Sequence, residues 1–516
     1  MVKSRTEYSA RNTAAAVLGK VAAILTGFCT RVVFTHTLSQ AYVGVNGLFM
    51  DILNILSLAE LGAGAAITYA LYRPVAVGDV EKQKSLMLLI RNFYRLVAVL
   101  VLASGLLVIP FMDVLIKGAP EGENLTLIYL LYLCNSALSY VMVYKRTLVD
   151  AHQLSYIGVL FQTGGWVVQG IIQITVLLTS RNFVLFVSVM SVCTLLSNLA
   201  VSVKADRLYP YLRDREVQKL PREERREIFR NTGAMLMHKI GTVLVNNTDN
   251  LLLSSLVGIV SNSLYSNYYL IIGAIHGVLR QAFQGLTASV GNLGAETEPR
   301  RVQRIFETTF FLGQWVYGLA AICLYELIDP FVALFFGPNY VFTKDVTLIL
   351  CLNFYLTGLR QPALVFRDSL GIFWYDRHKP LAEAAINLVT SILLGLRLGT
   401  VGVFLGTAIS TVTTSLWVEP LMLYRHFLGS SAKPYFWRCG LFASVTFLLW
   451  YGVDLLCRGV GGGLWAVCLK RLAICVLVTN PAYLLLYHRR REFRLLLDKA
   501  RLLLSRLWDG GRRETP

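Results

Sequence analysis

Long apolar runs constrain this chain more than any other feature. The stretches "LVAVLVLASGLLVIPF" (96–111) and "LAICVLVTNPAYLLLY" (472–487) are close to the length that crosses the hydrocarbon core of a bilayer. Of the 516 residues, 55% are hydrophobic and 16% are charged, whereas a soluble protein carries about 25% charged residues. The pattern is typical of an integral membrane protein. The first apolar stretch (13–38) is too long for the core of a cleaved signal peptide, so none is expected.

The apolar runs predict an all-α polytopic membrane protein with about 14 transmembrane helices. The second, eighth and ninth predicted spans are longer than a bilayer requires, and we expect them to tilt, kink or extend past the membrane. The predicted spans are 13–37, 43–71, 90–112, 125–146, 155–179, 182–204, 231–257, 263–293, 305–336, 345–366, 381–399, 401–424, 436–456 and 464–487.

The distribution of Lys and Arg supports this count. With the N-terminus placed in the cytoplasm, the predicted cytoplasmic segments hold 36 of the 49 basic residues and the outer loops hold five. Cytoplasmic loops of membrane proteins accumulate Lys and Arg in this way. We therefore predict a multi-pass protein of the cytoplasmic membrane with both termini in the cytoplasm. The same rule explains the net charge of +18, so nucleic acid is not expected as a partner.

A short repeat indicates two related halves. "RNTAAAVLGK" (11–20) and "RNTGAMLMHK" (230–239) are identical at five of ten positions. Because six spans separate them, both segments enter the membrane from the same side, as in transporters whose parallel halves enclose the substrate path. We predict two parallel-related six-helix bundles around a central cavity, followed by two further helices. The predicted domains are the N-terminal bundle (1–204), a basic cytoplasmic connector (205–230), the C-terminal bundle (231–430), the two additional helices (431–487) and a basic amphipathic cytoplasmic tail (488–516).

Several charged or polar residues fall inside predicted spans, where a Lys or Arg costs roughly 2.5–3.5 kcal/mol. A cationic cavity that binds an anionic cargo is one interpretation, and buried ion pairs that hold helices together are the other. The candidates for substrate binding are Lys20, Arg31, Lys239, Asn246, Arg280 and Arg360. The candidates for counter-charge or ion coupling are Asp51, Glu60, Asp249 and Glu383.

No motif for bond-making or bond-breaking chemistry is present. The chain lacks Walker A, HExxH and GxSxG motifs, and its nine cysteines include no CxxC pair. We therefore expect a transporter without catalytic residues, metal site or cofactor, coupled to H⁺ or Na⁺ if any ion drives it. A sugar chain on a lipid pyrophosphate suits a cationic, hydrated cavity, because each unpaired hydroxyl costs about 4–8 kcal/mol in hydrocarbon.

Two stretches resemble a known family. "YVGVNGLFMDILNILSLAELGAGAAI" (42–67), within 41–96, and "FRDSLGIFWYDRHKPLAEAAINLVTSILLGLRLGTVGVFLGTAIS" (366–410) are similar to the signatures of polysaccharide flippases of the multidrug/oligosaccharidyl-lipid/polysaccharide exporter superfamily. The resemblance implies two six-helix bundles, alternating access and an undecaprenyl-pyrophosphate-linked oligosaccharide as cargo for capsule, O-antigen or exopolysaccharide synthesis. It also implies cationic residues in spans 1, 2 and 8. Lys20, Arg31 and Arg280 match spans 1 and 8, whereas span 2 offers only Asp51 and Glu60.

Two other functions remain open from the sequence. One is a multidrug antiporter of the same fold, whose cationic cargo calls for an acidic cavity. The other is a membrane scaffold of a cell-wall synthesis complex that transports nothing. Expected partners are membrane lipids, contacted by the amphipathic stretch 491–508, and the polymerase and glycosyltransferases of the same pathway.

Overall fold

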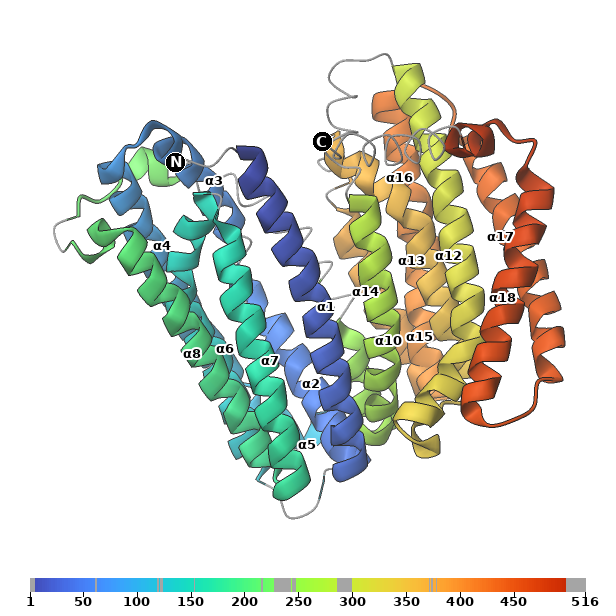
Figure 1. Cartoon of the computed structure of the whole chain (residues 1–516), viewed down its shortest axis with the longest axis horizontal. Helices are drawn as coiled ribbons and strands as arrows, with labels where there is room; N and C mark the ends of the chain where they lie inside the picture. The colour runs from blue at the N-terminus through green and yellow to red at the C-terminus, as the bar shows by residue number, and fades with distance from the viewer. Residues whose placement is uncertain are drawn as a thin grey trace, which may run out of the picture. The chain divides into compact units, whose positions relative to one another are not determined.

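The computed structural model describes residues 5–497, apart from 61–62, 118–119, 121–123, 153, 215–216, 227–242, 244–246, 285–298, 371, 373–374 and 377. All of the regular structure in these residues is helical (Figure 1). The longer helices are α1 (Arg5–Thr37), α2 (Gln40–Leu56), α3 (Ala63–Val77), α4 (Val80–Leu106), α6 (Leu125–Ala151), α7 (Ser155–Thr179), α8 (Phe183–Leu208), α10 (Ile259–Gln284), α12 (Pro299–Phe335), α13 (Lys344–Ser369), α14 (Lys379–Leu398), α15 (Thr400–Ser410), α16 (Leu416–Leu423), α17 (Lys433–Arg458) and α18 (Leu464–Tyr487).

Short helical turns connect some of these helices. They are η1 (Ser57–Glu60), η2 (Ile109–Phe111), α5 (Met112–Leu115), η3 (Pro210–Arg213), η4 (Leu253–Val257), η5 (Pro338–Tyr340), η7 (Thr411–Ser415) and η8 (Tyr424–Leu428). The chain divides into two compact units, Met1–Ser266 (unit 1) and Asn267–Pro516 (unit 2).

Unit 1 is a helix bundle. In it α1 packs against α7, while α6 packs against α4 and α8 (Figure 1). Polar caps set where three helices begin. Asp79, Asn124 and Asn182 each accept a hydrogen bond from the backbone N–H three residues later, at 2.9–3.0 Å. Such a cap satisfies a backbone donor that the helix leaves unpaired.

The start of α10 is anchored inside unit 1. The buried Asn262 donates from Nδ2 to the carbonyl oxygen of Gly44 in α2, at 3.0 Å. Position 44 has to be glycine for this approach, because an added Cβ would overlap the carbonyl oxygen of Ile259. The backbones of α2 and α10 therefore lie almost in contact at this point.

Unit 2 is built around α12, the longest helix of the described chain at 37 residues. It packs against α13, α17 and α18 (Figure 1). The α14–α15 hairpin is equally tight, since a Cβ added at Gly402 would overlap the backbone carbonyl of Leu394. A dense aromatic cluster fills the space between α12 and α17. Phe306 and Phe310 lie 5.7 and 4.6 Å from the ring of Tyr435, measured between ring centroids.

The predicted class is confirmed. Within the described residues, 11 helices are long and apolar enough to cross a membrane, and each overlaps a predicted span. The last begins and ends at 464 and 487, as the sequence predicted. The fold is therefore that of an all-helical, multi-pass membrane protein. The total of about 14 spans and the domain boundaries at 204, 231 and 431 stay predictions.

Three predicted spans are not among these eleven. The span 43–71 is interrupted, because α2 ends at Leu56 and α3 begins at Ala63. The hydroxyl of Ser57 donates to the carbonyl oxygen of Asn54 at 2.6 Å, and Gly62 and Gly64 follow, which are poor helix formers. The spans 231–257 and 263–293 lie partly outside the described residues. So does most of the amphipathic stretch 491–508, and so do residues 230–239 of the repeat.

Candidate functional site

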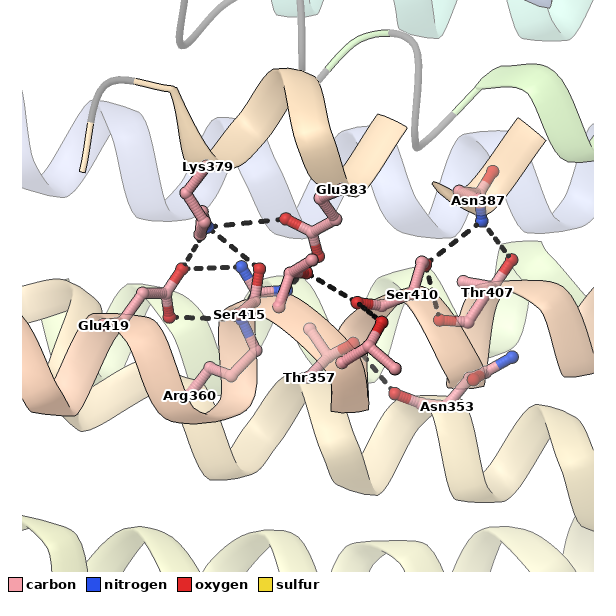
Figure 2. A network of polar contacts seen from close by, with 12 residues as sticks. Asn353, Thr357, Arg360, Lys379, Glu383, Asn387, Thr407, Ser410, Ser415 and Glu419 are labelled. Carbon is pink, nitrogen blue, oxygen red and sulfur yellow. Dashed lines mark hydrogen bonds and ion pairs between the residues drawn. The ribbon is translucent and has the colours of Figure 1, made fainter. Parts of the chain in front are cut away.

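Six charged side chains of unit 2 meet in one place, which we name the buried charge cluster. Its members come from α13, from the turn that follows it, from α14 and from α16, and Figure 2 labels Arg360, Lys379, Glu383 and Glu419 among them. They are Arg360, Arg367, Asp376, Lys379, Glu383 and Glu419. Glu419 is completely buried, and none of the other five is an exposed residue. Three cations and three carboxylates make the cluster neutral.

Arg360 joins three helices. Its guanidinium grips Glu419 of α16 with two parallel bonds, Nη2 to Oε1 at 2.7 Å and Nε to Oε2 at 3.2 Å. Its Nη1 donates to Oε1 of Glu383 in α14 at 3.1 Å. The paired bonds to Glu419 fit the planar fork of the arginine side chain, an arrangement that lysine cannot reproduce. Arg360 therefore holds α13, α14 and α16 at a defined spacing.

Lys379 is the second cation on Glu419. Its Nζ lies 2.5 Å from Oε1 of Glu419 and 3.4 Å from Oε2 of Glu383, which is one turn along α14. It also donates to the hydroxyl of Ser415 at 2.9 Å. Ser415 ends the π-helical turn η7, and such turns often lie at functional sites. The wider turn places a neutral acceptor beside the lysine.

A second pair completes the cluster. Arg367 lies seven residues after Arg360, on the same face of α13. Its Nη1 donates to Oδ2 of the buried Asp376 at 2.9 Å. Its Nη2 contacts Oδ1 of the more exposed Asp368 at 2.8 Å. The turn between α13 and α14 is thus tied to α13 by an ion pair.

Neutral polar side chains continue from the cluster along α14 (Figure 2). Asn387 lies one turn beyond Glu383 and donates to the hydroxyl of Thr407 in α15 at 2.9 Å. Ser391, a further turn on, donates to the carbonyl oxygen of Val403 at 2.9 Å. From the opposite side, Asn353 of α13 donates to the carbonyl oxygen of Phe404 at 2.9 Å. One polar seam therefore connects α13, α14 and α15.

The charged end of the seam is buried, and an unpaired charge in such a place destabilises the folded protein. Removing one partner of a buried ion pair costs about 3–5 kcal/mol, because the other charge stays buried without compensation. With its charges paired, the cluster can fix the relative positions of its helices. It can also act as a switch if a proton, an ion or a cargo phosphate displaces one partner. Among the described residues, no three His, Cys, Asp or Glu side chains are grouped as metal ligands would be.

The structure brings together two of the predicted site residues of unit 2, Arg360 and Glu383. Arg280 is exposed on α10, within electrostatic range of His276 and Tyr317. Lys239 and Asn246 lie outside the described residues.

In unit 1 the predicted residues have different surroundings. Lys20 is exposed on α1, whereas Arg31 is half-buried and interacts with the Tyr132 hydroxyl. Asp51 accepts a hydrogen bond from Nδ2 of Asn250. Glu60 accepts one from the Tyr94 hydroxyl at 3.3 Å.

Asp249, the neighbour of Asn250, is buried. In unit 1, therefore, Asp51 and Asn250 are joined directly, and the cationic candidates are on α1.

Sequence reasoning missed four members of the cluster, namely Arg367, Asp376, Lys379 and Glu419. The first three fall in what was predicted to be a cytoplasmic loop (367–380). Glu419 gave a usable signal, since it is a carboxylate inside the apolar stretch "LWVEPLML". Arg360 was identified because a charged side chain inside an apolar span is energetically unfavourable, and the same reasoning applies to Glu419.

Comparison with known proteins assigns the chain to a family. The family model described as polysaccharide biosynthesis protein matches residues 9–286, more than half of the chain. The chain belongs to the polysaccharide biosynthesis protein family. The family resemblance predicted from the sequence is therefore confirmed. No curated protein sequence matches this family member.

Solved structures show the fold of this polysaccharide biosynthesis protein. Lipid II flippase MurJ in an inward closed conformation is 13% identical, with a TM-score of 0.67, covering 92% of this chain and 98% of that one. An inward-facing multidrug resistance MATE family transporter of the MOP superfamily is 15% identical, with a TM-score of 0.60, covering 78% and 94%. An outward-facing transporter of that description is also 15% identical, with a TM-score of 0.55, covering 81% and 95%. The family member thus has the fold of MOP-superfamily transporters.

Proposed function

We propose that this protein is a flippase that moves an undecaprenyl-pyrophosphate-linked oligosaccharide repeat unit across the cytoplasmic membrane by alternating access. The observation that carries the proposal is membership of the polysaccharide biosynthesis protein family in a chain with a transporter fold. A membrane protein of this pathway has to handle a sugar chain whose hydroxyls cross hydrocarbon only at a cost of several kcal/mol each. A polar-lined path removes that cost.

Cationic residues would recognise the pyrophosphate. Lys20, Arg31, Lys239 and Arg280 are the proposed contacts, with Asn246 as a neutral donor. Arg360 would reach the cargo only by exchanging Glu383 for a phosphate oxygen, because both of its carboxylate partners lie within 3.1 Å. Arginine suits this exchange, since its fork binds phosphate and carboxylate with the same geometry.

Carboxylates would supply ion coupling. Asp51, Glu60, Asp249 and Glu383 are the proposed sites at which H⁺ or Na⁺ binds during the cycle. Asp51 is a suitable candidate because the described side chains hydrogen-bonded to it, those of Asn250 and Asn54, are neutral amides that do not compete with a coupling ion. Collapsing the proton and sodium gradients separately in a transport assay tests this, and indifference to both removes the coupling role.

A drug antiporter is the second candidate, favoured by the fold similarity to MATE transporters. Its cargo is cationic, so neutralising Arg31 or Arg280 would leave its transport intact. Uptake of a fluorescent cation into inverted vesicles would support this candidate. A scaffold that transports nothing would be equally insensitive to these changes, and it would show no uptake.

The flippase proposal is tested by export of surface polysaccharide from cells that depend on this protein. Arg31→Ala and Arg280→Ala should abolish export without lowering the amount of protein in the membrane. Arg397→Ala is the matched control, because Arg397 is exposed at the end of α14 and belongs to no proposed site. Full export by both test variants would exclude the proposed cargo contacts.

A further inference from the structure

Unit 1 contains a small polar pocket that the proposed function does not use. Its volume is about 260 Å³. One wall is a face of α4, where Lys84, Leu88 and Arg91 follow at helical spacing. The opposite walls are Tyr144 of α6 and the segment after α8, which contributes Tyr211, Leu212, Asp214 and Val217. The charge asymmetry of the sequence predicts that this end of unit 1 lies in the cytoplasm.

Arg91 supplies a guanidinium to the α4 wall of the pocket. Its Nε is buried, and no residue in the described part of the chain accepts a hydrogen bond from it. A buried charged donor without an acceptor is costly, and native structures normally satisfy such groups. The pocket therefore lacks an acceptor beside Arg91, and an anionic ligand would provide one.

Lys84 is the second cation of the pocket, and it is paired with two carboxylates of the protein. Its Nζ lies 2.7 Å from Oδ2 of Asp214 and 2.8 Å from Oε1 of Glu81. The side chain of Asp214 is 47% exposed, and that of Glu81 is 72% exposed. Ion pairs to carboxylates that water can reach contribute little to stability. A ligand anion can therefore take Lys84 from Asp214 at little cost.

The remaining walls are rigid. The buried Gln83 donates to the carbonyl oxygen of Pro74 at 3.1 Å and accepts a hydrogen bond from the Tyr211 hydroxyl at 2.6 Å. Burial raises the pKa of Tyr211 to about 12, so this hydroxyl remains a donor at neutral pH. Tyr144, Tyr211 and Leu212 also pack on the apolar cluster around Leu86 and Ile90. The pocket thus has a fixed floor, with the charged groups at its walls.

We propose that this pocket binds a phosphate group, with Arg91 as its principal ligand and Lys84 recruited from Asp214. Lys84 and Arg91 lie two helical turns apart, about 10 Å along α4, so their long side chains converge on one anion. Arginine and lysine together are a typical phosphate-binding pair. The volume admits a phosphate with a small organic substituent, which fits an anionic phospholipid headgroup or a soluble phosphate compound.

Binding would change how the segment after α8 is attached to α4. Asp214 lies between α8 and residues 227–242, and its described ion partner is Lys84. When phosphate occupies Lys84, Asp214 is released and the segment 209–217 loses one attachment to α4. The pocket would thus couple phosphate binding to the attachment of this segment within unit 1.

The test uses the full chain in detergent micelles with two probes. One arm titrates phosphatidylglycerol and counts bound lipid by native mass spectrometry. The other arm measures radiolabelled inorganic phosphate by equilibrium dialysis. Arg91→Gln should weaken binding about tenfold, the loss expected for one charge-assisted contact. Asp214→Asn should strengthen it several-fold, because the competing carboxylate is gone. Arg95 is an exposed residue one turn further along α4, and Arg95→Gln should leave both lipid binding and phosphate binding unchanged.

The outcomes distinguish a phospholipid headgroup from a soluble phosphate compound, and both of them from an absence of specific binding. Opposite shifts for Arg91→Gln and Asp214→Asn in the lipid arm assign a headgroup, and the same pattern in the phosphate arm assigns a soluble compound. Binding that is equal in all variants, or absent in both arms, overturns the proposal. So does a loss in Asp214→Asn as large as that in Arg91→Gln, because a damaged fold would weaken both.

Discussion

Two groups of cations in this molecule have opposite surroundings. In the buried charge cluster of unit 2, Arg360, Arg367 and Lys379 each lie within 2.9 Å of a carboxylate oxygen. In the pocket of unit 1, Arg91 Nε has no described acceptor, and Lys84 is paired with exposed carboxylates. Burial of a cation therefore does not indicate its role. The surrounding acceptors do, because a paired cation holds helices together while an unsatisfied one is ready for a ligand.

The largest expected effect on stability is at the paired cations of the buried charge cluster. Glu419→Gln removes the carboxylate shared by Arg360 and Lys379, so both cations lose their closest partner in a buried site. We expect the free energy of unfolding to fall by about 3–5 kcal/mol, measured by thermal or denaturant unfolding in micelles. Asp454→Asn is the control, because Asp454 pairs with the exposed Arg458 and its loss should have little effect on the free energy of unfolding. Equal losses of unfolding free energy in the two variants would contradict the contrast between buried and exposed ion pairs.

An intermediate effect is expected where a carboxylate is paired with a neutral group. Asn250→Ala removes the amide that donates to Asp51 in unit 1. A hydrogen bond to a charged group contributes about 1.5–3 kcal/mol, so the free energy of unfolding should fall by about that amount. If Asp51→Asn in the same background restores stability, the loss arises from the unpaired charge. If it does not, Asn250 stabilises unit 1 through other contacts.

A smaller effect is expected with pH, from a residue beside the pocket. His152 follows α6 and stacks on Tyr209, with 4.4 Å between ring centroids. Burial lowers the pKa of His152 below its usual 6.5. Above pH 6.5 the side chain is neutral in both states and has no effect. As the pH falls through 6.5, the unfolded chain binds a proton that the folded chain does not, so stability declines. His152→Phe should reduce the slope of unfolding free energy against pH between 7 and 5; an unchanged slope would assign it to other groups.

The smallest expected effect is at the unsatisfied cation. Arg91→Met removes a charge that has no described acceptor, so no pairing is lost. The free energy of unfolding should change by about 0.5 kcal/mol or less, or increase slightly, in the absence of phosphate. Arg367→Met is the matched comparison on a paired cation, because it leaves the carboxylate of Asp376 buried. A loss at Arg91 as large as that at Arg367 would place Arg91 in an ion pair after all.

The break in the predicted span 43–71 shows what hydropathy along a stretch of sequence does and does not predict. Hydropathy identified an apolar region there, but it did not reveal that α2 ends at Leu56, where the hydroxyl of Ser57 donates to the carbonyl oxygen of Asn54. The prediction succeeded for Leu464–Tyr487, where one apolar run is bounded by glycines at 461–463 and by basic residues at 489–491.

By itself the sequence determined the class of protein, most of its membrane-crossing helices and its family, since hydropathy, charge and signature residues are properties of short stretches. Arg360 was identified in the same way, from the cost of a charge in an apolar run. Only the tertiary structure decided that Glu419, 59 residues further along the chain, is its principal partner, and that Nε of Arg91 has no acceptor among the described residues. Pairing depends on which helix faces meet in space, and neither spacing nor composition within one helix specifies that.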